Sequence, residues 1–164
     1  MSLKRNKKLQ DWAKALNYSF LLLKYRPRSY EEIKSRLRQK GCPSSSIDKV
    51  LAYLTEKGYV NDEEFLRVFI ASSLAKGWGR RRIDLTLKRL GIAENLRQQV
   101  FKDNREACRG KLREIVERKI HKYKGTKNAY QKIVRYLASR GFDYEDIFRE
   151  LDNFGIEKFS DMGK

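Results

Sequence analysis

Residues 33–41 read Ile-Lys-Ser-Arg-Leu-Arg-Gln-Lys-Gly, and the same Ile-x3-Leu-x3-Gly pattern returns at residues 83–91 and 133–141. The three copies stand 50 residues apart with no shift in register. Ile and Leu four residues apart lie on one face of a helix, and a Gly after the last turn can adopt the left-handed C-terminal cap. Three copies at one fixed period predict an internal repeat built from helices.

Working outward from each copy, the apolar spacing predicts one helix before it and one after it, so each repeat has three helices. The expected N-cap residues are Ser29 in the first repeat, Asn61 in the second and Asp143 in the third. Ser44 or Ser45 is expected to cap the last helix of the first repeat.

Alternation typical of a strand is not found, so we expect an all-α protein. Three tandem three-helix repeats with a period of about 50 residues predict an elongated curved rod, because stacked neighbours bury more surface than a repeat alone. The predicted domains are 1–59, a first repeat with a basic N-terminal segment; 60–102, a second repeat with a Lys-Gly-Trp-Gly-Arg-Arg-Arg-Ile turn; 103–157, a third repeat; and 158–164, a frayed tail. Met1-Ser2-Leu3 is compatible both with a vector remnant and with a native start.

The charge is strongly basic: the 164 residues hold 38 Lys and Arg against 21 Asp and Glu, which gives +17 and a pI near 10.0. A hydrophobic content of 40% argues against disorder. No apolar run approaches the roughly 20 residues of a membrane span, and no signal peptide is visible. We therefore expect a cytoplasmic protein with a polyanionic partner and no membrane contact.

Catalytic and metal-binding patterns are missing from the sequence. There is no Walker-type phosphate loop, and one His leaves little scope for triads or metal sites. Cys42 and Cys108 are interpreted as structural thiols, and the acidic pairs fall in first helical turns, where capping explains them. We expect a binding protein rather than an enzyme, with no cofactor and no metal.

Basic side chains surround the second helix of every repeat, and stacked repeats would align them into one track. A solvated helix face is the alternative for any single Lys. Arg80, Arg81 and Arg82 stand at a helix start, where the positive end of the dipole disfavours cations unless a phosphate or carboxylate offsets the cost. Trp78 is a candidate for stacking on a base, although core packing explains it equally well. The candidate partner- or DNA-binding residues are Arg26, Arg28, Arg36, Arg38, Lys40, Lys76, Trp78, Arg80, Arg81, Arg82, Lys88, Arg89, Lys122, Lys124, Lys127 and Arg135.

The middle of the chain carries a family resemblance. Residues 53–65 read Tyr-Leu-Thr-Glu-Lys-Gly-Tyr-Val-Asn-Asp-Glu-Glu-Phe, residues 76–83 read Lys-Gly-Trp-Gly-Arg-Arg-Arg-Ile, and Leu90-Gly91-Ile92 closes the segment. This pattern resembles the RecX family of bacterial regulators of the RecA recombinase. Asn61, Leu66 and Arg80 depart from the residues usual in that family.

The resemblance implies three three-helix repeats that bind in the helical groove of the RecA–DNA filament. It implies modulation, mainly inhibition, of the recombinase, ATPase and co-protease activities of RecA, in DNA repair and the SOS response. We expect a monomer whose contacts with single- or double-stranded DNA are non-specific and salt-sensitive. The alternative from the residues alone is a general DNA- or RNA-binding helical module, and a scaffold or membrane-surface role ranks last.

Overall fold

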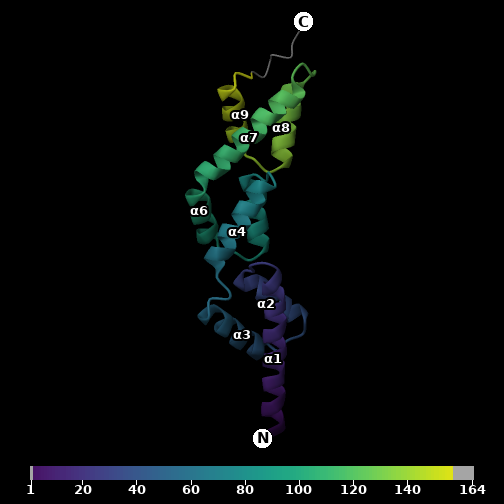
Figure 1. Cartoon of the computed structure of the whole chain (residues 1–164), viewed down its shortest axis with the longest axis vertical. Coiled ribbons are helices and arrows are strands. Elements are labelled where there is room, and N and C mark those ends of the chain that lie inside the picture. The colour runs from purple at the N-terminus through teal and green to yellow at the C-terminus, as the bar shows by residue number, and fades with distance from the viewer. Residues whose placement is uncertain (1, 157–164) are drawn as a thin grey trace. The chain divides into compact units, whose positions relative to one another are not determined.

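A computed structural model describes the backbone of residues 2–156 and the side chains from residue 11 onward. These residues form nine α-helices and no β-strand, which confirms the all-α prediction (Figure 1). The predicted tail at 158–164, Met1 and the side chains of Ser2 and Leu3 lie outside what the structure describes.

The nine helices follow the predicted order of three per repeat. The first repeat holds α1 (Ser2–Tyr25), α2 (Tyr30–Gln39) and α3 (Ser44–Glu56); the second holds α4 (Asp62–Ala75), α5 (Arg80–Arg89) and α6 (Glu94–Asp103); the third holds α7 (Arg105–Tyr123), α8 (Ala129–Ser139) and α9 (Tyr144–Asn153). The repeated pattern that opens the sequence therefore lies on α2, α5 and α8.

Two of the predicted N-cap residues cap their helices through their side chains, as expected. The Ser29 Oγ accepts a hydrogen bond of 3.2 Å from the Glu32 backbone N–H at the start of α2. The Asn61 Oδ1 accepts bonds of 2.9 and 3.1 Å from the second and third N–H groups after it, at the start of α4. Each side chain satisfies donors that a helix start otherwise leaves without partners.

The predicted cap of α3 was wrong. Pro43 is the N-cap residue, and Ser44 is already the first helical residue. The Pro43 carbonyl accepts from the backbone N–H groups of Ser46 and Ile47 at 2.9 and 3.0 Å. Asp143 does occupy the N-cap position of α9, but its side chain makes no capping bond.

The glycines of the repeated pattern end their helices as predicted. Gly41 and Gly141 have φ of +78° and +85°, a conformation that glycine adopts without steric cost. Their N–H groups donate to the Arg38 and Ala138 carbonyls at 2.9 and 3.0 Å, and the next N–H reaches back to Leu37 or Leu137. This is the Schellman arrangement, and its recurrence shows that the pattern encodes the helix end as well as its apolar face.

The chain divides into two compact units, of which unit 1 holds residues 1–69 with 89–92. Here α1, α2 and α3 pack against one another. Ile33 and Leu37, the first copy of the pattern, are fully buried among side chains from α1 and α3. The core residues are Ala15, Ile33, Leu37, Ile47, Val50, Leu51, Leu54 and Val60.

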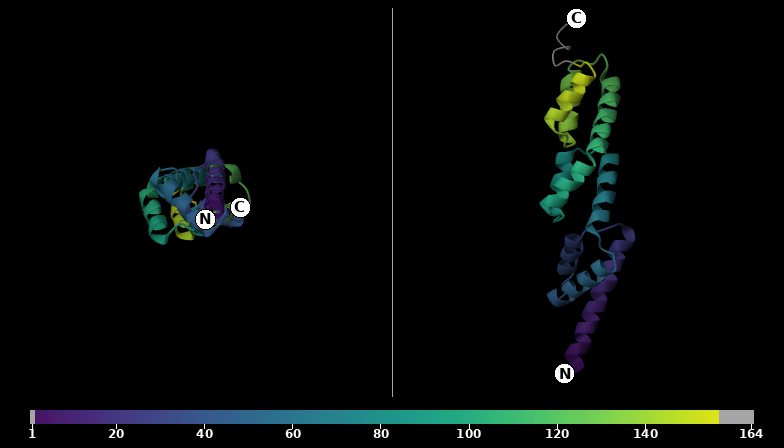
Figure 2. Two further views of the ribbon diagram at one scale, coloured as in Figure 1. Left: turned by 90° about the horizontal axis from the view of Figure 1, so that it is seen from below. Right: turned by 90° about the vertical axis from the view of Figure 1, so that its left-hand side faces the viewer.

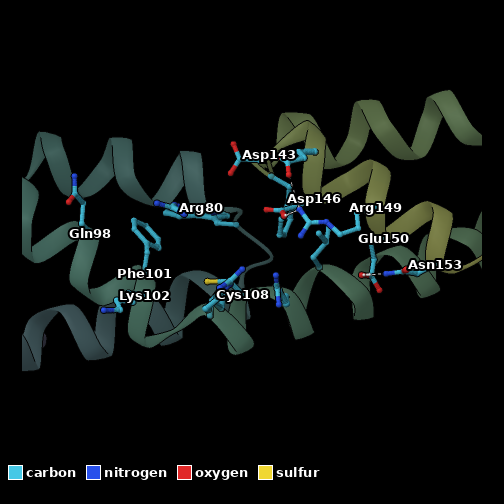
Figure 3. Close-up of a pocket in the computed structure, with 17 residues that line it drawn as sticks. Arg80, Gln98, Phe101, Lys102, Cys108, Asp143, Asp146, Arg149, Glu150 and Asn153 are labelled. Atoms are coloured by element: carbon cyan, nitrogen blue, oxygen red, sulfur yellow. Dashed lines mark hydrogen bonds and ion pairs between the residues drawn. The ribbon is translucent and has the colours of Figure 1, made fainter.

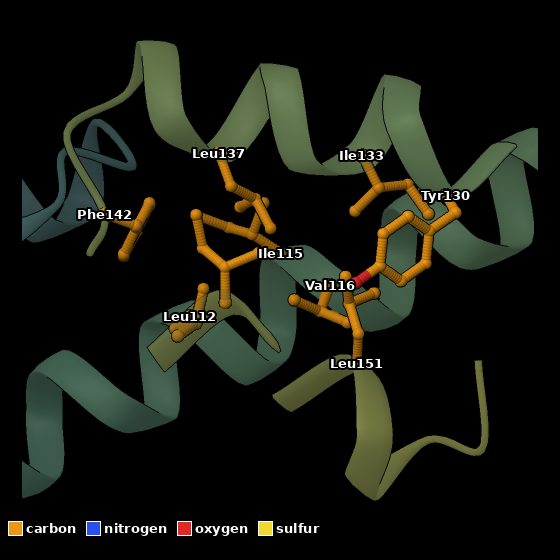
Figure 4. Packing of buried hydrophobic residues seen from close by; sticks show 9 residues of the cluster. Leu112, Ile115, Val116, Tyr130, Ile133, Leu137, Phe142 and Leu151 are labelled. Carbon is orange, nitrogen blue, oxygen red and sulfur yellow. The ribbon is translucent and has the colours of Figure 1, made fainter. Parts of the chain in front are cut away.

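Unit 2 holds residues 70–88 with 93–164, of which the structure describes those up to residue 156. Here α7, α8 and α9 pack mutually, and yellow α9 stays beside the green helices when the view is turned (Figure 2). Ile133 and Leu137, the third copy of the pattern, point from α8 toward Ile115 and Leu112 of α7 (Figure 4). The core residues are Leu112, Ile115, Val116, Tyr130, Ile133, Leu137, Phe142, Ile147 and Leu151.

The middle repeat is divided between the units, because residues 62–69 of α4 belong to unit 1 and the rest of α4 to unit 2. The third helix of the middle repeat, α6, has a polar residue at a position that is apolar in the other two repeats. Arg97 stands in register with the buried Ile47 and Ile147, and its Nε lies 2.8 Å from the Asp84 Oδ1. A half-buried ion pair thus replaces apolar packing between α5 and α6.

Candidate polyanion interface

The sixteen predicted contact residues are mostly at the surface. Fourteen are exposed, while Arg28 and Trp78 are half-buried. Unit 1 carries Arg26, Arg28, Arg36, Arg38, Lys40 and Arg89, and unit 2 carries the other ten. A single track along all three repeats stays a prediction.

Two of the N-terminal arginines pair with a buried acid. Glu32 is 8% exposed, and its carboxylate accepts from both guanidinium N–H groups of Arg26, at 3.0 and 2.6 Å. The same carboxylate pairs with Arg28, whose Nε is buried without a hydrogen-bond partner. The interaction anchors the α1–α2 connection, so these two cations are poorly placed for an external anion.

The three consecutive arginines at the start of α5 point to three different partners. The Arg80 guanidinium lies 5.1 Å from the Phe101 ring centroid, and that of Arg82 lies 4.5 Å from the Trp78 ring centroid. Arg81 Nε lies 3.9 Å from the Asp143 Oδ1. Since Lys76 also lies 5.4 Å from the Trp78 ring, this ring already has two cations near it, which favours packing over base stacking.

Carbonyl oxygens satisfy N–H groups at the start of α5. The Gly79 N–H donates to the Arg140 carbonyl at 2.8 Å, and the Arg81 N–H donates to the Gly141 carbonyl at 2.9 Å. We call this contact the second clasp, because an equivalent contact, the first clasp, lies one repeat earlier in the chain. The partial negative charge of two carbonyls offsets the helix dipole there, in the place where the sequence suggested a phosphate or carboxylate of a partner.

A matching contact, the first clasp, lies at the start of α2. The Ser29 Oγ donates to the Leu90 carbonyl at 3.4 Å, and these positions are 50 residues before Gly79 and Arg140. A Cβ on Gly91 would lie 2.7 Å from the Glu31 Cβ, so the backbone approaches closely in this clasp too. Both clasps join the second helix of one repeat to the turn that follows the second helix of the next.

Lys40 Nζ lies 5.5 Å from the Tyr18 ring centroid, and the remaining predicted cations are available to a partner. Their side chains are exposed and form no ion pair or ring contact within the described residues. We call them the open cations: Arg36, Arg38, Lys88, Arg89, Lys122, Lys124, Lys127 and Arg135. They occur in both units, but only Arg38 and Lys88 share a repeat position. Both units therefore carry open cations, but these cations mostly occupy different positions in the different repeats.

A cavity of about 710 Å³ in unit 2 has walls of opposite charge (Figure 3). The cations Arg80, Lys102, Arg105, Arg109 and Arg149 line it beside the acids Asp143, Glu145, Asp146 and Glu150. Burial, with help from nearby Asp146, raises the pKa of the Asp143 carboxyl, while Arg81 and Arg80 oppose the rise. A cavity with this many carboxylates is unsuited to a phosphate backbone, so we leave it out of the interface.

Both cysteines are reduced and half-buried. Burial raises the pKa of Cys42, and likewise that of Cys108, which makes either thiol a weaker nucleophile. Among the described residues, no group of His, Cys, Asp and Glu is arranged to hold a metal ion. Over the same residues, no helix has the length and apolar content needed to cross a membrane.

The sequence interpretation missed one surface feature. Tyr144 and Phe148 on α9 are 51% and 41% exposed, with ring centroids 5.9 Å apart. A comparison of the repeats could have indicated this exposed aromatic pair, because the equivalent positions in the first repeat hold the polar residues Ser44 and Asp48.

Known proteins match the chain over most of its length. The models of the RecX first, second and third three-helix domains match residues 15–54, 61–100 and 110–151, in that order. The regulatory protein RecX of Chlorobaculum tepidum is 31% identical over 137 residues, which are 81% of this chain and 83% of that protein. The regulatory protein RecX of Caldanaerobacter subterraneus subsp. tengcongensis is 26% identical over 142 residues, which are 84% and 69% of the two chains.

Solved structures share the fold. The crystal structure of RecX from Lactobacillus salivarius has a TM-score of 0.78 and 20% identity, covering 91% of this chain and 99% of that one. A second crystal structure, of regulatory protein RecX, has a TM-score of 0.71 and 17% identity, covering 89% and 74%. The resemblance carried by residues 53–92 is confirmed, as are three tandem three-helix domains. The chain belongs to the RecX family of regulatory proteins.

Proposed function

We propose that the chain binds in the helical groove of the RecA–DNA filament and mainly inhibits the recombinase, ATPase and co-protease activities of RecA. The observation that carries the proposal is the presence of open cations in both units of a chain with three RecX domains. The chain acts as a cytoplasmic monomer and hydrolyses nothing itself.

Electrostatics supports a polyanionic partner. DNA carries one negative charge per roughly 1.7 Å of duplex axis, so a filament on DNA presents regularly spaced phosphates. Exposed arginines and lysines contact such phosphates, or carboxylates of RecA, at little conformational cost because no internal ion pair has to break first. Many modest contacts add up, and a single substitution is expected to have a small effect.

The test mixes the purified chain with RecA filaments formed beforehand on single-stranded DNA and follows ATP turnover and strand exchange. Both rates are expected to fall at stoichiometric protein. Rates that stay unchanged over a tenfold range above stoichiometry would refute the proposal.

A pair of charge-reversal variants tests the role of the open cations. Arg36→Glu/Arg38→Glu is expected to weaken inhibition about tenfold, on the basis of roughly 1 kcal/mol for two exposed charge contacts plus the repulsion introduced. Lys49→Glu/Lys57→Glu changes the net charge of unit 1 equally, at exposed positions outside the predicted set. Equal loss in both variants would mean that only the net charge matters.

A general DNA- or RNA-binding module is the second candidate, because the open cations need no RecA to contact phosphate. A gel shift without RecA separates the two functions. Tight binding that selects one duplex sequence favours the second candidate, whereas weak, salt-sensitive binding to any sequence favours the filament regulator.

A further inference from the structure

The third repeat has an apolar groove formed at positions that are polar in the other two repeats. It lies between α8 and α9, has a volume of about 590 Å³, and is lined by Val134, Ala138, Tyr144 and Phe148 among others. We call it the α8–α9 groove. The Tyr144 and Phe148 rings are tilted by 33° to one another and remain substantially exposed.

The repeats themselves show that the fold does not need these apolar side chains. The equivalent positions are Lys34, Arg38, Ser44 and Asp48 in the first repeat. In the second repeat they are Asp84, Lys88, Glu94 and Gln98. Two repeats thus form the same pair of helices with polar residues there. The fold therefore does not require apolar residues at these positions, and a contiguous exposed apolar patch is typical of an interaction site.

The charge along the groove indicates what would fill it. Arg135 lines the groove and is an open cation, Lys132 is exposed one turn earlier, and α8 contains no acidic residue. The acids Glu145 and Asp146 at the start of α9 line the cavity of mixed charge instead and accept hydrogen bonds from Arg149. The α8–α9 groove is thus an apolar depression with a basic edge.

A protein segment fits such a groove better than nucleic acid does. Single strands need stacked rings along a basic channel. Here a single cation lines the depression, and aliphatic Val134 and Ala138 form part of its surface. An amphipathic helix that inserts apolar side chains and sets a carboxylate against the basic edge uses all of these features.

We propose that the α8–α9 groove is a protein-docking surface that receives an amphipathic, acidic segment of RecA. This inference rests on the proposed function and adds a contact that does not depend on DNA. The aromatic pair supplies the apolar anchor, and Arg135 pairs with a carboxylate of the segment.

The test grafts residues of the first repeat onto the third. Tyr144→Ser/Phe148→Asp recreates the pair Ser44 and Asp48, which the same helix geometry already tolerates. Sedimentation with RecA–DNA filaments should show binding weaker by about tenfold or more, as expected when anchoring aromatic residues are lost from an interface. Affinity of the isolated chain for a dT oligonucleotide should stay within about twofold, since stacking would add little here.

Other results overturn the inference. If the variant binds filaments as the wild type does, the groove is not a docking surface. If it loses oligonucleotide affinity in parallel, the rings stack on bases and the partner is nucleic acid. Tyr144→Ser alone, which changes only a half-exposed ring, gives the same comparison if the double variant is unstable. Failure of the wild type to inhibit RecA would instead refute the proposed function.

Discussion

At the scale of the residue, Gly79 decides whether the start of α5 can meet the turn after α8. A Cβ at this position would lie 2.2 Å from the Phe142 nitrogen and 2.4 Å from the Gly141 oxygen. Both are backbone atoms, so no side-chain rotation relieves the clash. The two hydrogen bonds of the second clasp require this closeness.

Gly79→Ala is therefore expected to lower the free energy of unfolding by about 2 kcal/mol or more, as overpacking does. Urea unfolding followed by circular dichroism measures it. The control is Gly110→Ala on α7, where a Cβ meets nothing within 4 Å. That change should raise stability by up to about 1 kcal/mol, because Ala is the better helix former. Equal effects of the two changes would mean that the clasp adds nothing to stability.

Asp143 should make stability depend on pH. Its pKa is raised above the ordinary 3.8, first by burial and then by Asp146, so the ionised form is disfavoured in the fold. The destabilisation of the fold by the ionised carboxylate is fully present above the raised pKa and vanishes below the ordinary pKa. Asp143→Asn should increase the urea midpoint at pH 7 and leave it unchanged near pH 3. A lower midpoint at pH 7 would show that the exposed contact with Arg81 outweighs the burial cost.

Residue roles were predictable from sequence where the partner is local. Ser29 and Asn61 bond to N–H groups within three residues, so their types and positions identify the caps. The partners of Arg80 and Arg81 lie in α6 and at the start of α9, far along the chain. No local pattern contains that information, and the arginines therefore looked free to bind a phosphate.

At the scale of the element, each helix of the repeated pattern has one buried and one exposed face. On α5, Ile83 and Leu87 are fully buried, whereas Leu85 between them is 49% exposed. Side chains two residues apart on a helix point in different directions. The spacing of Ile and Leu therefore predicted the buried face correctly.

Leu87→Asp should lower the free energy of unfolding by several kcal/mol, because it places a carboxylate in an apolar site. Leu85→Asp is the matched control and should change it by about 0.5 kcal/mol or less, as exposed substitutions do. Thermal unfolding by circular dichroism is the measurement. A folded Leu87→Asp variant with the stability of the control would contradict the assignment of the α5 core face.

The third helices were harder to predict than the second. The apolar spacing predicted a helix at α6, yet its Leu96 and Val100 are half-buried and Phe101 is the buried side chain. The Arg97–Asp84 pair takes a position that is Ile in the other repeats. Tertiary pairing of this kind overrides the apolar period and could not be predicted from α6 alone.

At the scale of the whole molecule, the charge should appear as salt dependence of DNA affinity. Each phosphate contact on a single strand contributes about 0.7 to the slope of log affinity against log salt. Arg36→Gln/Arg38→Gln should therefore reduce the slope for a dT oligonucleotide by up to about 1.4. Fluorescence anisotropy at several salt concentrations measures it, with Lys49→Gln/Lys57→Gln as control. An equal reduction in the control would show that the arginines make no specific contact.

The two clasps also bear on how such a chain can lengthen. The hydrogen-bond donor lies at the start of the second helix of a repeat, and the acceptor lies in the turn that follows the same helix of the next repeat. A duplicated repeat therefore contains both the donor and the acceptor of a clasp. Gly41 is the equivalent of Gly91 and Gly141, the glycines of the two clasps. A Cβ on Gly41 would meet no described atom within 4 Å, so no helix start covers this turn within the described residues. A family built this way can gain a repeat by gene duplication without evolving a new interface.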